Sequence, residues 1–258
     1  MAKKWTPFPF ADEAYVYDGN SLKDHWARLH AGDQEPFPKD KSLQEAWRRY
    51  HAGDFAEAVA IGLEAGVEGY AVANKAASIY ANYLEDNDTA KQKIFQEVAA
   101  RCDEARAALP KHANSHYFYA YAMGRYSQSI SVGAALAQGL GGKIKDALLA
   151  TLKLEPKHAE AQTAYGSYQA EVINKVGGMV AGLTYGAKKD SALEHFQQAL
   201  KLTPHAAIAH VEYANGLLLL FGNAKIDEAT RLYEKAAACE PVEAMERLDV
   251  EKAKEELA

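Results

Sequence analysis

Residues 192–241 read ALEHFQQALKLTPHAAIAHVEYANGLLLLFGNAKIDEATRLYEKAAACEP and contain one short pattern twice. An alanine is followed by an aromatic residue, a second alanine and a proline at offsets 4, 7 and 12, first from Ala192 and again from Ala229. The two copies start 37 residues apart. Self-similarity at a period of this size is typical of stacked helical repeats. The stretch therefore predicts an all-α fold.

The spacing of the pattern explains why such helices must stack. Offsets 0, 4 and 7 lie on one face of an α-helix, so the aromatic ring is flanked by two small residues. A neighbouring helix can approach closely over the alanines and pack around the ring. The proline ends the helix, because the residue before a proline is pushed out of the α region. A helix of this kind cannot bury its face alone and needs partner helices.

Weaker copies of the pattern precede this stretch. Pro110 and Pro156 are each followed by Lys-His-Ala, and Pro204 is followed by His-Ala-Ala. We expect the histidines at these positions to begin or pack helices. A tyrosine stands nine residues after each proline and precedes a small residue, in the pairs Tyr119-Ala120, Tyr165-Gly166 and Tyr213-Ala214. The pair fits a close contact between the two helices of one repeat.

With these motifs the chain resembles the tetratricopeptide repeat family. That family has a large residue before Gly or Ala in its first helix, and Ala, an aromatic residue, Ala and Pro in its second. The resemblance is strongest over residues 157–241 and extends to residues 99–156 and 43–66, where Trp47, Tyr50 and Gly53-Asp54-Phe55 are similar to a first repeat. It implies a right-handed α-solenoid of stacked helix pairs.

Composition narrows the class of protein. The 258 residues, 48% of them hydrophobic, are enough for one continuous array of about six helix pairs. The net charge of −6 and the scattered Lys and Arg argue against nucleic acid as a partner. Cys102 and Cys239 are expected to be small buried thiols. We find no signal peptide and no apolar run of about 18 residues, so we expect no integral membrane segment and a cytoplasmic location.

The chain is expected to divide into three parts. Residues 1–40 are rich in aromatic residues and proline, contain a short helix from Ser21, and are predicted to lie across the first helices. Residues 41–241 form the repeat array, and residues 242–258 form a C-terminal capping helix with a charged outer face. Within the array we predict helices at residues 42–52, 55–65, 70–85, 89–108, 113–128, 143–154, 160–175, 191–202, 208–221 and 227–238.

Two insertions lengthen the middle repeats. The interval from Pro110 to Pro156 is 46 residues and that from Pro156 to Pro204 is 48, against about 34 for an ordinary repeat. Both insertions, at residues 131–142 and 176–187, are rich in glycine and small apolar residues. In one interpretation the first helix of each repeat simply runs on. In the other, the two extensions meet and wall an apolar pocket, with walls at Met179, Val180, Leu183 and Tyr185.

A second resemblance covers residues 100–240 and rests on three stretches. These are Leu154-Glu155-Pro156, Glu171-Val172 and residues 183–187, with the sequence LTYGA. In these the chain is similar to the regulator of microtubule dynamics family and to the tetratricopeptide component found beside tripartite solute transporters. The resemblance implies a ligand that is apolar or lipid-like, bound inside the solenoid. For the first family it also implies roles at organelle contacts or microtubules.

The residues that carry binding are predicted on the concave face, which the first helix of each repeat lines in the tetratricopeptide family. Aromatic and aliphatic side chains dominate these positions, which suits an apolar helix or a lipid-like ligand, and Arg125 could meet an anionic group. The predicted binding residues are Tyr117, Tyr121, Arg125, Thr163, Glu171, Val211, Asn215 and Leu218.

No catalytic or metal-binding arrangement can be read from the spacing of the polar residues. His112 and His116 are four residues apart, but no third ligand joins them, so we expect no metal and no cofactor. The sequence therefore predicts a non-catalytic scaffold that binds a protein or peptide segment in its groove. The alternative is a carrier or sensor of an apolar small molecule held between the glycine-rich extensions.

Overall fold

A computed structural model describes residues 5–258, and within that range every regular element is helical. The first four residues of the predicted N-terminal segment lie outside this range. The α-helices are α1 (Ser21–Leu29), α2 (Lys41–His51), α3 (Phe55–Glu64), α4 (Tyr70–Tyr83), α5 (Asp88–Ala108), α6 (Ala113–Gln128), α7 (Val132–Ala137), α8 (Leu140–Leu154), α9 (Ala159–Val176), α10 (Gly178–Val180), α11 (Lys189–Leu202), α12 (Ala207–Phe221), α13 (Ile226–Ala237) and α14 (Ala244–Glu255).

The helices that the sequence predicts are confirmed, and polar side chains begin several of them. Asp40 accepts hydrogen bonds from the backbone N–H groups of Ser42 and Leu43 at the start of α2. His158, one of the histidines that follow a proline, accepts from the N–H of Ala161 at the start of α9. Each of these bonds satisfies a donor that has no partner inside the helix.

The alanine–aromatic–alanine face forms a tight socket between helices. Phe196 of α11 is fully buried, with Ala192 and Ala199 on either side of it. Its ring lies against Gly166 of α9 and Gly216 of α12, close enough that an added Cβ at Gly216 would come within 2.4 Å of a ring carbon. The close approach predicted from the small residues is therefore present.

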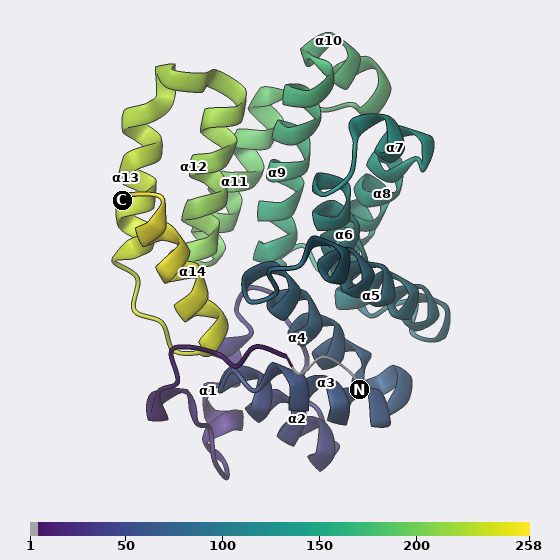
Figure 1. Ribbon diagram of the computed structural model, residues 1–258, viewed down its shortest axis with the longest axis vertical. Coiled ribbons are helices and arrows are strands. Elements are labelled where there is room, and N and C mark those ends of the chain that lie inside the picture. The colour runs from purple at the N-terminus through teal and green to yellow at the C-terminus, as the bar shows by residue number, and fades with distance from the viewer. Residues whose placement is uncertain (1–4) are drawn as a thin grey trace.

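Successive helices pack against one another, and the array curls round on itself (Figure 1). Each helix of the series α2, α4, α6, α9, α12 and α14 contacts the next one in that order. The last of them, α14, also contacts α2, so the two ends of the array meet. These six helices therefore form a closed ring of contacts.

The aromatic segment before α1 lies across this junction. Trp5 stacks on Tyr80 of α4 with ring centroids 3.9 Å apart, and Phe8 packs edge-on against Phe55 of α3. The hydroxyl of Tyr17 donates to the carbonyl of Val242 at 2.7 Å. This segment thus ties the first helices to the start of the last one.

The two extensions do not continue the preceding helices. Helix α6 ends at Gln128, and Ser131 accepts a hydrogen bond from Ala134 N–H to begin the separate α7. Gly139, with a φ of 64°, separates α7 from α8. In the second extension, Gly177, with a φ of 80°, ends α9 before α10 and a π-helical turn at Ala181–Tyr185. The interpretation that each helix runs on is therefore wrong, because α6 stops at Gln128 before Ser131 begins α7, and Gly177, with its positive φ, ends α9.

Buried polar contacts close the array at α14. Arg28 of α1 binds both carboxylate oxygens of Glu246, at 2.6 and 3.0 Å. His51 of α2 contacts the buried Glu243, and Tyr83 of α4 donates to the buried Asp249. The predicted outer charged face is present at Glu251 to Glu256, but the inner face of α14 also carries acidic groups.

We expect the contact between Glu243 and His51 to make stability depend on pH. Burial raises the pKa of Glu243 to about 8, and burial lowers the pKa of His51 well below 6.5. The folded pair therefore keeps one proton up to about pH 8, whereas in the unfolded chain the glutamate and the histidine lose theirs near pH 4.5 and 6.5. Between pH 6.5 and 8 the folded state holds more protons, so stability falls as pH rises, by at most about 1.4 kcal/mol per pH unit.

The variant Glu243→Gln tests this prediction. Gln has no proton to lose, so its unfolding free energy is expected to fall less than that of the wild type between pH 6.5 and 8. Urea unfolding at both pH values measures the difference, and other titrating groups cancel in the comparison. If the unfolding free energy changed equally with pH in the two proteins, Glu243 would not be the group that holds the proton.

Candidate functional site

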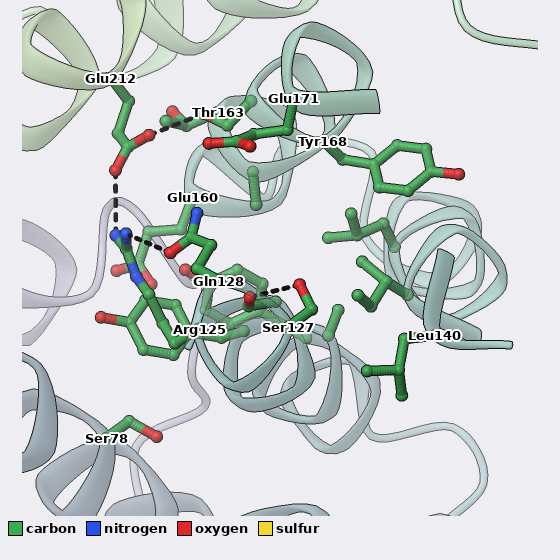
Figure 2. A pocket seen from close by; sticks show the side chains of 18 of the residues that line it. Ser78, Arg125, Ser127, Gln128, Leu140, Glu160, Thr163, Tyr168, Glu171 and Glu212 are labelled. Carbon is green, nitrogen blue, oxygen red and sulfur yellow. Dashed lines mark hydrogen bonds and ion pairs between the residues drawn. The ribbon is translucent and has the colours of Figure 1, made fainter. Parts of the chain in front are cut away.

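A cavity of about 210 Å³ lies inside the curled array. Side chains from α4, α6, α7, α8, α9, α12 and α14 line it, together with Tyr185 at the end of the second extension. Figure 2 labels lining residues from α4, α6, α8, α9 and α12. Gln128, Leu136 and Lys175 line the cavity and are also exposed, which places its opening between α7 and the end of α9.

One side of the cavity is apolar. Leu140, Ile144 and Leu148 recur every fourth residue of α8, so they share one helix face and point to the interior. Gly124 of α6 leaves open space beside them, since an added Cβ there would meet no atom within 4 Å. Further apolar lining comes from Ile79, Phe118, Val132, Ala135, Leu136, Ala164, Tyr168, Val172 and Val176.

The opposite side carries a paired arginine. Arg125 of α6 binds Glu212 of α12 at 3.0 Å (Figure 2). Glu212 also accepts from the hydroxyl of Ser167 at 2.8 Å. The guanidinium lies over the ring of Tyr121, 5.4 Å from its centroid. These contacts hold Arg125 in one position while leaving its side chain 26% exposed. A partly accessible, fixed cation of this kind suits an anionic or polar ligand group.

Ionisable side chains of α4, α9 and α14 line a third part of the cavity wall. Lys75 donates to Glu160 at 3.1 Å and to the buried Asp33 behind it at 2.5 Å. Burial raises the pKa of Glu160, although Lys75 opposes the shift. Burial also raises the pKa of Asp249 well above its usual value, which favours the neutral acid at this point of the wall. The buried Ser78 hydroxyl lines the cavity and has no hydrogen-bond partner among the described residues.

The structure gathers half of the sequence-predicted residues around this cavity. Those that line it, from α6, α9 and the second extension, are Tyr117, Tyr121, Arg125, Thr163, Glu171 and Tyr185.

The predicted residues of α12 do not reach the cavity. Val211 is buried in the core formed with α11, α13 and α14, and Leu218 packs against the same core. Asn215 accepts a hydrogen bond from Tyr233 at 2.5 Å. These three positions do not line the cavity, because α12 turns Ile208 and Glu212 toward it.

Three of the predicted pocket walls are also misplaced. Met179, Val180 and Leu183 are 80%, 48% and 85% exposed and do not line the cavity. The chain turns outward after Gly177, whose positive φ redirects the backbone. The first extension supplies the wall instead, through Val132, Leu136 and the start of α8.

Sequence reasoning did not find Lys75, Ser78 or Asp249. Lys75 interrupts the run of mostly small and apolar residues at 70–81, and a lone lysine in such a run is a signal that could have been used. Asp249 offers no such signal, because the many charged residues of α14 predict a helix on the surface. Its role depends on the contact between α14 and α4, which no local pattern encodes.

Metal centres and membrane spans are two further classes of functional feature. Within residues 5–258, no group of three or more His, Cys, Asp or Glu side chains is arranged to hold a metal ion. No helix in that range combines the length and the apolar character needed to cross a membrane.

Comparison with known proteins places the chain in one family. A search of curated proteins finds no match. The family model described as regulator of microtubule dynamics protein 1–3 matches residues 55–258, which include every α-helix from α3 to α14 and all of the cavity lining. The match spans well over half of the sequence. The chain therefore belongs to the regulator of microtubule dynamics protein 1–3 family.

Proposed function

We propose that this protein is a non-catalytic binding protein that holds a small, elongated molecule with an apolar body and one polar end. The observation that carries the proposal is the two-sided cavity. Its wall at α8 is apolar, whereas Arg125 and Lys75 lie on the other sides with their acidic partners. A ligand would gain from burial of its apolar part and from a hydrogen bond to a fixed polar group.

We further propose that the array is a right-handed solenoid of the tetratricopeptide type. Support comes from the repeated alanine–aromatic–alanine faces and from the contacts between alternate helices. In such a solenoid the series α2, α4, α6, α9, α12 and α14 supplies the inner helices, and the cavity occupies the interior that they surround.

The enclosure of the cavity favours a small molecule over a peptide. Met245 and Asp249 of α14 line the interior opposite α8, so the last helix occupies a side from which a peptide would enter an open groove. The unpartnered hydroxyl of Ser78 supports the same proposal, since a buried polar group without a partner is costly and a ligand atom would satisfy it.

A protein or peptide partner is the second candidate. The family description names regulators of microtubule dynamics, a role that concerns other proteins. Exposed apolar residues such as Leu136 at the opening of the cavity offer a contact for such a partner.

Filling the cavity tests the first candidate. Gly124→Phe adds a side chain beside α8 whose Cβ meets no atom within 4 Å, and replacing a mid-helix glycine by Phe favours the helix by about 0.5 kcal/mol. We expect native mass spectrometry of freshly purified protein to show a co-purifying apolar molecule in the wild type and a loss of at least tenfold in the variant.

Gly142→Phe is the matched control. Gly142 also has open space around it and lies in α8, but it does not line the cavity. This variant is expected to retain the ligand. Two results would contradict the ligand proposal and favour the protein partner. One is a wild-type protein that carries no ligand and takes none from a lipid extract. The other is a Gly124→Phe variant that still carries the ligand.

A further inference from the structure

The large apolar residues that the structure leaves exposed are concentrated in the two extensions. Within residues 5–258, five of the eleven exposed large hydrophobic residues lie there, including the two most exposed. Val132 and Leu136 are four residues apart on α7, and Met179 and Leu183 are four residues apart after Gly177, so each pair shares one side of its short helix. Together with Val180 these residues form what we call the apolar rim.

The two halves of the apolar rim belong to one region of the molecule. Lys145 of α8 donates to the carbonyl of Tyr185 at 2.8 Å, and the Tyr185 ring lies against Gly141. Helices α7 and α10 both lie at the end of the molecule away from α1 and α2 (Figure 1). Val132 and Leu136 also line the cavity, so the apolar rim borders its opening.

The charge around the apolar rim is distinct from that of the whole chain. The protein has a formal net charge of −6, yet residues 105–145 and 172–189 contain no Asp or Glu. The same two stretches contribute Lys143, Lys145, Lys175, Lys188 and Lys189 at or near the extensions. Lys175 pairs with Glu171, and Lys189 donates to the carbonyl of Leu220, whereas Lys143 and Lys188 are exposed and form no ion pair with any described residue.

We propose that the apolar rim docks onto an anionic lipid bilayer. Contiguous exposed apolar side chains mark interaction surfaces, and apolar tips flanked by lysines and free of acidic residues match a negatively charged membrane surface. In this arrangement Met179, Val180 and Leu183 enter the headgroup region and the lysines meet the lipid phosphates. The opening of the cavity then faces the bilayer. The proposal goes beyond ligand binding and does not depend on it.

Vesicle flotation tests the proposal. The probes are vesicles of two parts phosphatidylcholine to one part phosphatidylserine, and vesicles of phosphatidylcholine alone. We expect the wild type to float with the first and much less with the second. Met179→Asp/Leu183→Asp is expected to weaken binding at least tenfold, and because both side chains are at least 80% exposed, the fold should be unaffected. Lys143→Glu/Lys188→Glu is expected to weaken binding several-fold and to reduce its dependence on salt.

Two further variants show whether binding occurs through this surface. Leu63→Asp changes a 41% exposed leucine on α3, outside the extensions, and should bind as the wild type does. Leu183→Trp should show a blue-shifted emission when phosphatidylserine vesicles are added, since the native tryptophans lie in residues 1–50. Gly124→Phe, which fills the cavity, should still bind vesicles, so failure of ligand binding and failure of docking are distinguishable.

Three results would overturn the proposal. The first is a wild type that floats with neither vesicle. The second is equal binding by Met179→Asp/Leu183→Asp and the wild type. The third is a dimer in sedimentation velocity that Leu183→Asp dissociates, which would make the apolar rim an interface between two copies of the chain.

Discussion

Lys75→Met is expected to destabilise the protein by about 3–5 kcal/mol at pH 7, because it removes the lysine that pairs with the buried Asp33 and the partly buried Glu160. The Lys75 side chain is 2% exposed and pairs with Asp33, which is 1% exposed, and with Glu160. Burial alone would lower the pKa of Lys75, but Asp33 and Glu160 raise it well above its usual value. Urea unfolding monitored by circular dichroism measures the loss. Lys93→Met, at a 76% exposed lysine on α5, is the control and should change stability by less than about 0.5 kcal/mol.

The pH dependence of this variant identifies the cause of the loss. In the wild type, burial acts to raise the pKa of Asp33. His30 and Lys75 nevertheless hold this pKa well below its usual range. Without Lys75, the pKa values of Asp33 and Glu160 rise in the folded state above their unfolded values. Protonation then favours folding, so the deficit of Lys75→Met relative to the wild type should shrink as pH falls from 8 to 5. A deficit that is constant over this range would indicate lost packing rather than unpaired charge.

Lys75 also shows where reading the sequence fails. The loop after α1 brings Asp33 and Glu35 into the interior, where Glu35 accepts from Asn114 of α6 at 2.6 Å and Asn114 accepts from His158 at 2.8 Å. The prolines and charges at residues 34–40 give no sign in the sequence that the neighbouring carboxylates are buried. Buried carboxylates are rare unless paired, and here Lys75 of α4 pairs with Asp33 and Asn114 of α6 with Glu35, while His158 at the start of α9 holds Asn114. Local patterns cannot predict a network assembled from four separate segments.

The helices were predictable because each one carries its own signals. Helix α6 begins and ends at the predicted residues, and α11 and α12 differ from the prediction by at most two residues at either end. The residues that line the cavity were harder to predict, because they depend on how far each helix is rotated about its own axis. In α12, Glu212 faces the cavity and the neighbouring Val211 faces the core. Moving one residue along a helix rotates the side-chain direction by about 100°. A register taken from the family's repeat pattern is not accurate enough to fix that direction.

The socket around Phe196 gives the second large effect and tests the motif that decided the fold. Phe196→Ala is expected to cost about 3–5 kcal/mol, because the ring is fully buried and stacks on Tyr213 with centroids 5.2 Å apart. Chemical denaturation measures this loss. The control is Phe221→Ala at the end of α12, where the side chain is only partly buried and the loss should be smaller.

A double-mutant cycle with Gly216 separates close packing from simple burial. In the wild type, Gly216→Ala should destabilise, because its Cβ would lie 2.4 Å from the Phe196 ring. In the Phe196→Ala background that ring is absent, so the added methyl group fills part of the space and favours the helix, and the same substitution should be neutral or stabilising. If Gly216→Ala had the same effect in both backgrounds, the helices would not approach one another over the ring. The small residues beside the aromatic ring would then have no role in how the repeats stack.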